Sequence, residues 1–190
     1  IVKIHTVILA AGEGSRMHSK KAKSLQPVGG QSMLKRIHNT VSSLTEETSF
    51  VVGYEKDSVV TEVKKFPGIN HICEQKKPIG TADAVKSALD SINADSKVLV
   101  LYGDVPLIKR QTLNNLISMT DDSLTIMSTE LKNPTGYGRV KKNENGAAIS
   151  IIEEKDASED EKKVKEIFTG ILCCNKTLLE EAIDEVSNDN

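Results

Sequence analysis

The sequence has few cysteines, no marked excess of positive or negative charge, and no long hydrophobic run. Its three cysteines, Cys73, Cys173 and Cys174, lack the spacing of a metal site and fit free or buried thiols in a reducing compartment. Its 25 basic and 27 acidic residues give a net charge of −2, which offers no broad basic surface to nucleic acid. These shortages favour a cytoplasmic protein whose partners are not nucleic acids.

The lack of long apolar runs also argues against a membrane protein. No run approaches the roughly 20 residues of a membrane-spanning helix, and the run at residues 7–11 leads into Gly12 and polar residues, unlike a signal peptide. The 190 residues suffice for one domain with a hydrophobic core. Because the chain starts at Ile1 and stops just after a helical pattern, we expect a piece of a longer protein.

Strand-like and helix-like segments alternate up to about residue 135. The predicted strands are residues 3–11, 50–52, 71–73, 97–101 and 124–129. The predicted helices, from the spacing of their apolar residues, are 32–44, 59–66, 81–92 and 112–119. This alternation is typical of parallel strands with helices packed on both faces, so we predict an α/β fold.

The pattern changes after residue 135. Residues 138–142 and 147–152 flank the turn-forming residues 143–146, which predicts an antiparallel hairpin. Three further predicted segments are a charged loop or helix at 158–166, a strand at 168–174 and a helix at 178–186. We therefore predict one domain over residues 1–190, built on a mixed, mostly parallel sheet.

A glycine-containing loop follows the first predicted strand, at the end of the sheet where ligands bind in such folds. Gly12 and Gly14 let the backbone approach a ligand, and consecutive N–H groups can bind phosphate oxygens. The loop matches neither the dinucleotide fingerprint nor the Walker A motif. A tight structural turn is the alternative interpretation, but Arg16 and Lys23 add two cations that such a turn does not need.

An aspartate follows the most hydrophobic predicted strand. Asp104 comes directly after Tyr102 and Gly103, where the sheet is expected to open a crevice. A carboxylate at this point is well placed to hold Mg²⁺ between phosphate groups. A helix cap or turn acid is the alternative for a lone aspartate, and the phosphate loop on a neighbouring strand favours the metal ligand.

The histidines show no ligand-like spacing, and we expect His5, His18, His38 and His71 to be structural or on the surface. The sequence therefore offers no pattern of a nucleophile activated by a histidine base. This suits phosphate transfer in which the attacking phosphate is already an anion. Catalysis then rests on alignment and on charge neutralisation.

Several short motifs extend along the whole chain. They are Leu-Ala-Ala-Gly-x-Gly-Ser-Arg-Met (9–17), Lys23, Gln75, Ile-Gly-Thr-Ala (79–82), Leu-Tyr-Gly-Asp-Val-Pro-Leu (101–107), Pro-Thr-Gly-Tyr-Gly-Arg (134–139) and Glu-x-Lys-Asp-Ala (153–157). With them the chain resembles the pyrophosphorylase domain of bacterial bifunctional N-acetylglucosamine-1-phosphate uridyltransferases. The first motif is broad among sugar nucleotidyltransferases, whereas the last three together are more specific to the UDP-N-acetylhexosamine branch.

This resemblance implies a Rossmann-like nucleotidyltransferase domain with Mg²⁺ as its cofactor. The implied reaction joins UTP to N-acetylglucosamine-1-phosphate, giving UDP-N-acetylglucosamine and pyrophosphate. The product would serve peptidoglycan and lipopolysaccharide precursor synthesis, and through it cell shape. Members of the family form trimers through a β-helix acetyltransferase domain, but no hexapeptide repeat occurs in these 190 residues, so we expect this chain alone to be a monomer.

The resemblance also implies roles for individual residues. The uridine side would be held by the backbone of Leu9, Ala10, Ala11 and Gly12. The uracil ring would be read by Gln75, Gly80 and Thr81, because an amide can satisfy both a donor and an acceptor. The ribose and the metal would lie at Tyr102, Gly103 and Asp104, with Asp104 as the metal ligand. The phosphates would face Arg16 and Lys23, Arg16 chiefly at the leaving pyrophosphate.

On the sugar side, the resemblance assigns the amino-sugar contacts to Gly138 and Glu153. Glu154 is a neighbouring alternative to Glu153, but the spacing to residues 155–157 favours Glu153. Position 168 is Phe where the family has a ligand-contacting asparagine, and a buried partner left unpaired there would cost roughly 1–3 kcal/mol.

Further departures lie on the phosphate side and beyond the chain. Glu13 adds a negative charge to the phosphate loop unless it points to solvent, and Ala22 replaces a proline that usually precedes the lysine. The second metal ligand of the family, an asparagine, lies in a segment beyond residue 190. Two alternatives to the implied reaction stay open: a nucleotidyltransferase for another base or sugar, and a module that binds a nucleotide sugar without turnover.

Overall fold

The computed structural model describes residues 2–14, 17, 19, 21–77 and 79–186. The chain divides into two compact units. The first comprises Ile1–Thr125 and Leu172–Asn190, and the second comprises Ile126–Ile171. Strand β10 (Glu166–Asn175) is continuous along the chain from the second unit into the first.

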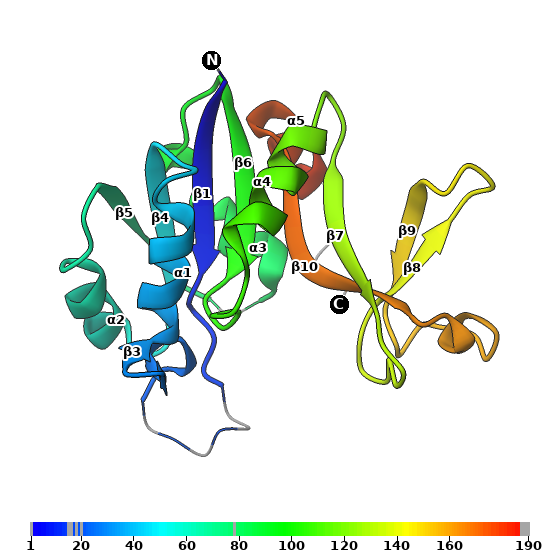
Figure 1. The fold of residues 1–190 in the computed structure, drawn as a ribbon, viewed down its shortest axis with the longest axis horizontal. Helices are drawn as coiled ribbons and strands as arrows, with labels where there is room; N and C mark the ends of the chain where they lie inside the picture. The colour runs from blue at the N-terminus through cyan, green and yellow to red at the C-terminus, as the bar shows by residue number, and fades with distance from the viewer. Residues whose placement is uncertain (1, 15–16, 18, 20, 78, 187–190) are drawn as a thin grey trace. The chain divides into compact units, whose positions relative to one another are not determined.

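A mixed, mostly parallel sheet forms the centre of the first unit (Figure 1). Its strands are β1 (Lys3–Leu9), β4 (Glu47–Val52), β5 (Ile69–Glu74), β6 (Ser96–Tyr102) and the last residues of β10. The order is β5-β4-β1-β6-β10; the first four are parallel, and β10 is antiparallel to β6. The predicted sheet is confirmed, with each central strand close to its expected position.

Helices cover both faces of this sheet, as the alternating pattern predicts. They are α1 (Met33–Val41), α2 (Lys56–Val63), α3 (Thr81–Lys86), α4 (Arg110–Met119) and α5 (Lys176–Asp184). Figure 1 shows α1 and α4 on one face and α3 and α5 on the other. A short antiparallel pair, β2 (Pro27–Val28) and β3 (Gln31–Ser32), precedes α1.

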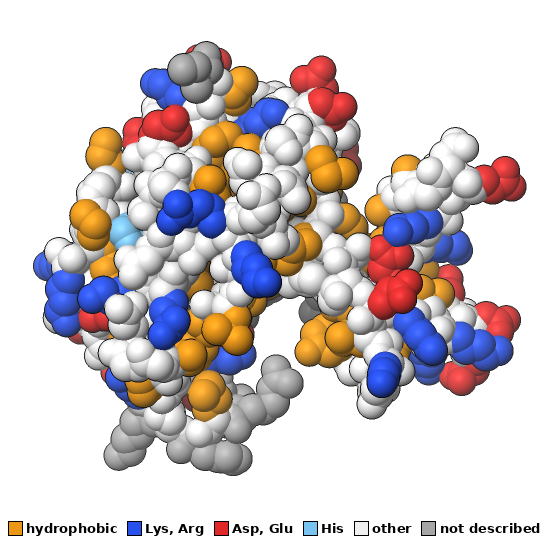
Figure 2. Space-filling model, viewed as in Figure 1, with side chains coloured by type: hydrophobic (Ala, Val, Ile, Leu, Met, Phe, Trp, Pro, Cys, Tyr) orange, Lys and Arg blue, Asp and Glu red, His pale blue; other side chains and the backbone are white. Residues whose placement is uncertain are grey.

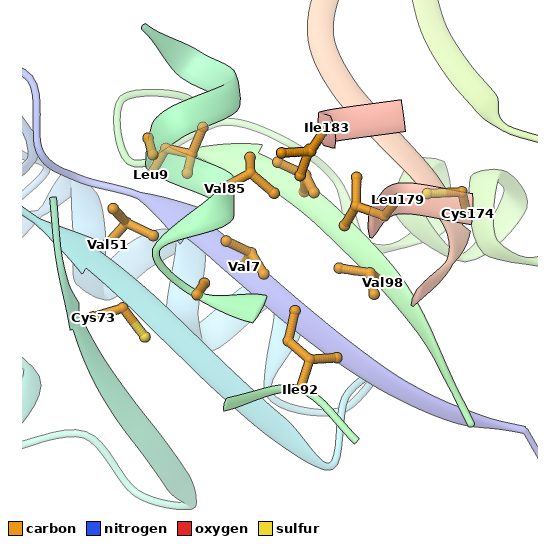
Figure 3. Packing of buried hydrophobic residues seen from close by; sticks show 13 residues of the cluster. Val7, Leu9, Val51, Cys73, Val85, Ile92, Val98, Cys174, Leu179 and Ile183 are labelled. Carbon is orange, nitrogen blue, oxygen red and sulfur yellow. The ribbon is translucent and has the colours of Figure 1, made fainter. Parts of the chain in front are cut away.

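The hydrophobic core has two parts, one on each face of the sheet, because successive side chains of a strand point to opposite faces. Val7 of β1 packs with Val98 of β6, Val85 of α3 and Ile183 of α5 in one buried cluster (Figure 3). Residues 5–9 of β1 are all buried, as expected for a parallel strand covered on both sides. The burial of this strand fixes the position of its carboxyl end, where a ligand site is expected.

One predicted helix is shorter than its pattern. Residues 81–92 form α3 and then a separate 3₁₀ turn (Leu89–Ser91). The Ser87 and Ser91 hydroxyls donate hydrogen bonds to the carbonyls of Ala84 (2.7 Å) and Ala88 (2.6 Å). Serines that bond to nearby backbone carbonyls compete with regular helical hydrogen bonding, which gives a physical reason for the break.

The second unit contains β7 (Thr125–Glu130, whose first residue belongs to the first unit), β8 (Arg139–Lys142), β9 (Ala148–Ile152) and the beginning of β10. Strands β8 and β9 form the predicted antiparallel hairpin. At its turn, Asn143 Oδ1 accepts hydrogen bonds from the amides of Asn145 and Ala147, both at 3.0 Å. The charged segment 158–166 contains a 3₁₀ turn (Glu161–Lys163).

The three cysteines lie on strands and are free and buried. Cys73 belongs to β5, while Cys173 and Cys174 are adjacent in β10. Burial raises the pKa of both β10 thiols, that of Cys174 to about 12. None of the helices in the described part of the chain is long and apolar enough to span a bilayer.

A partly buried polar network lies near the amino-terminal ends of β1, β4 and β5. His5 Nε2 is 2.7 Å from Ser49 Oγ, which is 2.6 Å from Ser91 Oγ. The His5 ring stacks on His71 at 5.8 Å, and His71 hydrogen bonds to Glu47 at 2.7 Å. Burial lowers the pKa of His5 from 6.5 to about 4, with Glu47 opposing this shift. His5 is therefore neutral in the folded protein at pH 7.

This network predicts acid-sensitive stability. Unfolded His5 gains a proton near pH 6.5 but folded His5 only near pH 4, so the unfolded state binds more protons between these values. The free energy of unfolding should therefore fall as the pH drops through this window, by up to about 3 kcal/mol from His5. His5→Gln should flatten the decrease in urea unfolding series from pH 7.5 to 4. An equally steep decrease in parent and variant would contradict this assignment.

Candidate active site

A cavity of about 420 Å³ opens where the carboxyl ends of the central strands meet. Leu9 ends β1, Tyr102 ends β6, and Gln75 follows β5 directly. The lining residues are Leu9, Ala10, Ala11, Gly12, Gly14, Met17, Lys23, Ser24, Gln75, Gly80, Thr81, Ala84, Tyr102, Gly103 and Asp104. Every residue that the sequence assigns to the nucleotide side thus lines this one cavity, apart from Arg16, which lies outside the described residues.

The ends of β1 and β6 approach each other closely. The Gly103 amide donates a 2.8 Å hydrogen bond to the Leu9 carbonyl, and the Ala10 amide donates one to Val51 at 2.8 Å. A Cβ on Gly103 would lie 3.1 Å from both the Leu9 carbonyl oxygen and Ser24 Cβ. Glycine therefore suits this position, because a Cβ would need the neighbouring atoms to give way by a few tenths of an ångström.

Lys23 and Asp104 form an ion pair within the cavity. Lys23 begins a 3₁₀ turn (Lys23–Leu25) that follows the buried Ala22. The Lys23 and Asp104 side chains are 35% and 30% exposed, so solvent and solutes can reach both groups. The predicted convergence of a cation and a carboxylate is present, although Arg16 cannot be placed.

Gln75 is held by two acceptors. Its Nε2 donates hydrogen bonds to the Gly80 carbonyl and to Asp83 Oδ2, both at 3.0 Å. Next to Gly80, Thr81 Oγ1 lies 3.4 Å from the Tyr102 hydroxyl. Asp83 is a residue that sequence reasoning missed, because an acid in the first turn of a helix has the ordinary interpretation of favourable helix-dipole charge.

In the second unit, Gly138 and Glu153 are neighbours. A Cβ on Gly138 would lie 3.2 Å from Glu153 Oε1 and 2.8 Å from Ile151 Cγ2. The Phe168 amide donates a 3.0 Å hydrogen bond to the Gly138 carbonyl. The two residues assigned to the amino sugar are thus adjacent within their unit, with the unusual Phe168 on the neighbouring strand.

Arg139 organises the surroundings of this pair. Its side chain is 2% exposed, and it donates to the Tyr137 carbonyl and, at 2.6 Å, to Glu154 Oε2. The Arg139 hydrogen bond, together with one from the Gly136 amide, lowers the pKa of Glu154. Glu154 is thereby committed to a structural ion pair, which favours Glu153 as the carboxylate beside Gly138.

The described residues fit a partial magnesium site. They contain no cluster of three His, Cys, Asp or Glu side chains. Magnesium commonly uses one or two carboxylates, with substrate phosphates and water completing its shell. Asp104 in a solvent-accessible cavity meets this requirement for one ligand. Glu13 is exposed and does not line the cavity, so its charge is turned to solvent.

The fold and the cavity define a nucleotidyltransferase-like protein. Residues 6–145 match the family model of the MobA-like NTP transferase domain, and the chain belongs to this family. A protein from Bacillus anthracis proposed to be a glucose-1-phosphate thymidylyltransferase has a similar structure, with a TM-score of 0.76 and 21% identity. The similarity covers 97% of this chain and 76% of that one, and it supports the fold.

More specific similarity comes from curated sequences. The chain is 38% identical over 189 residues to the bifunctional protein GlmU of Marinobacter nauticus. It is 40% identical over 188 residues to the protein of that name from Neisseria meningitidis. Each match covers 98% of this chain and 41% of the relative, so the chain spans about two fifths of their length.

The contact at Gly103 predicts a difference between two cavity glycines. Gly103→Ala should destabilise the protein by about 1–3 kcal/mol, because its Cβ meets buried backbone that cannot easily move. Gly12→Ala is the matched control, since a Cβ there meets nothing within 4 Å. Urea unfolding of the two variants measures the difference. Equal stability would show that the ends of β1 and β6 can separate without cost.

Proposed function

We propose that this chain carries the uridylyltransferase site of an enzyme that joins UTP to N-acetylglucosamine-1-phosphate with Mg²⁺. The products would be UDP-N-acetylglucosamine and pyrophosphate. The observation that supports this most is the single cavity that gathers the glycine-containing loop, Gln75, Lys23 and Asp104. The similarity to GlmU proteins along 98% of the chain supports a sugar-phosphate nucleotidyltransferase.

The proposed reaction needs no protein nucleophile. An oxygen of the sugar phosphate attacks the α-phosphorus of UTP, a new P–O bond forms, and the bond to the β-phosphate oxygen breaks as pyrophosphate leaves. Bound magnesium would neutralise charge on the phosphates, with Asp104 among its ligands. Lys23 would face the phosphates, and we assign Arg16 to the leaving pyrophosphate on the family resemblance. Catalysis then consists of alignment and charge neutralisation.

The ion pair between Lys23 and Asp104 suits this proposal. Each group neutralises the other in the protein without substrate. Asp104 would then pair with the metal of a bound metal–triphosphate complex and Lys23 with its phosphate oxygens, so one ion pair would be replaced by two. Because both side chains are partly exposed, this exchange would not require the core to open.

The sugar and the cellular setting are less constrained. Phe168 lies beside Gly138, at a position where the family has an asparagine, so a nucleotidyltransferase for another sugar phosphate is the second candidate function.

We propose that residues 1–190 form part of one nucleotidyltransferase domain, monomeric on its own. We expect it to act in the cytoplasm in the synthesis of cell-wall precursors, consistent with its free cysteines.

Pyrophosphate release tests the proposal. The whole protein that carries this chain should release pyrophosphate from UTP, Mg²⁺ and N-acetylglucosamine-1-phosphate. Asp104→Asn should reduce kcat by about 100-fold or more while weakening UTP binding much less. The reason is that the Asp104 carboxylate would hold the magnesium that neutralises phosphate charge in the transition state. No release under conditions where UTP binds would refute the activity. A variant as active as the parent would refute the role of Asp104.

The neighbouring positions of Gly138 and Glu153 predict a selective effect on the sugar side. Gly138→Ala should raise KM for the sugar phosphate about tenfold with little change in KM for UTP, because the added methyl group displaces Ile151 or Glu153. Steady-state kinetics with each substrate varied in turn measures this split. Gly12→Ala on the nucleotide side serves as the comparison. Equal changes in both KM values would show that the pair does not contact the sugar.

A further inference from the structure

The Gln75 amide has a fixed orientation. Its nitrogen is within 3.0 Å of two oxygens, the Gly80 carbonyl and Asp83 Oδ2, neither of which can donate a hydrogen bond when Asp83 is ionised. Turning the amide over would place its own oxygen against these two acceptors. The surroundings therefore select one of the two amide orientations on physical grounds.

This orientation changes what Gln75 can offer to a ligand. A glutamine amide has two N–H donors and one carbonyl acceptor, and both donors are already used within the protein. No hydrogen bond from the described residues reaches Gln75 Oε1. Gln75 lines the cavity, so the group that it can offer there is an acceptor.

Pyrimidine bases differ in the hydrogen-bonding group that they present to such an acceptor. At position 3 of the ring, uracil and thymine carry an N–H donor, whereas cytosine carries a bare nitrogen that is itself an acceptor. An acceptor held in place attracts the N–H of uracil or thymine and repels the ring nitrogen of cytosine. Polar groups that are buried without a partner also cost free energy. A free amide would give no such discrimination, because it could turn over to suit either base.

We propose that Asp83 is a positioning residue that makes Gln75 selective for pyrimidine bases with an imide N–H. Asp83 does not need to contact the nucleotide; it acts by occupying the second N–H of Gln75. This inference rests on the proposed function, in which Gln75 meets the base. It goes further because it names the residue that sets the base preference. The contact with Gln75 would accept thymine as well as uracil, since both carry the imide N–H.

Binding of UTP and CTP tests the proposal independently of turnover. The dissociation constants of both nucleotides are measured by calorimetry for the parent protein and three variants. Asp83→Leu removes the acceptor and should reduce the preference for UTP over CTP about tenfold, the value of one hydrogen bond. Asp83→Asn keeps an acceptor oxygen and should retain the parental preference within about threefold.

Asp57→Leu is the matched control. Asp57 also lies in the first turn of a helix, α2, none of whose residues lines the cavity. It reports the effect of losing a first-turn carboxylate without disturbing Gln75. We expect the parental preference for UTP in this variant.

The outcomes separate the inference from the proposed function. Loss of preference in Asp83→Leu, with preference kept in Asp83→Asn and Asp57→Leu, supports the positioning role. An unchanged preference in Asp83→Leu, or equal weakening of both nucleotides, overturns it while leaving the proposed function intact. A parent protein that binds neither nucleotide refutes the proposed function, and the inference fails with it.

Discussion

The close approach of the ends of β1 and β6 is the constraint on which the candidate site depends. Leu9 pairs with Tyr102 in the parallel ladder, and the next amide, that of Gly103, bonds to the Leu9 carbonyl. This places the backbone after β1 and the Asp104 carboxylate on the same cavity, within reach of Lys23. The rest of the first unit, with helices on both faces, holds these two strands in register. Figure 2 shows basic, acidic and hydrophobic side chains mixed on the face in view.

Much of the fold and of the nucleotide side could be predicted from local patterns. The continuous apolar residues are 98–101 in β6 and 7–9 in β1, as expected for strands that helices cover on both faces. Residues after parallel strands share one edge of the sheet, which is why Gly12 and Asp104 could be assigned to one cavity from their positions alone. The structure pairs Lys23 with Asp104 in this cavity, whereas the metal-binding role of Asp104 and the role of Arg16 stay predictions.

The features that could not be predicted depend on partners that the fold brings together. The break after α3 follows from serine hydroxyls bonding to the backbone, which the apolar spacing does not reveal. The orientation of the Gln75 amide depends on an acid eight residues later. The ion pair of Arg139 with Glu154 joins the first residue of β8 to the segment that follows β9. His5, read as structural from its spacing, belongs to a network reaching Ser91 through Ser49.

The buried thiols can report local opening of the fold through their reaction with a thiol reagent. A maleimide or disulfide reagent attacks the thiolate, and Cys174 is both shielded from solvent and held protonated far above neutral pH. Modification at Cys174 therefore requires a local opening of the packing around the end of β10, and its rate measures how often that opening occurs. Such an experiment needs no introduced label, because the chain's own buried Cys174 can be followed.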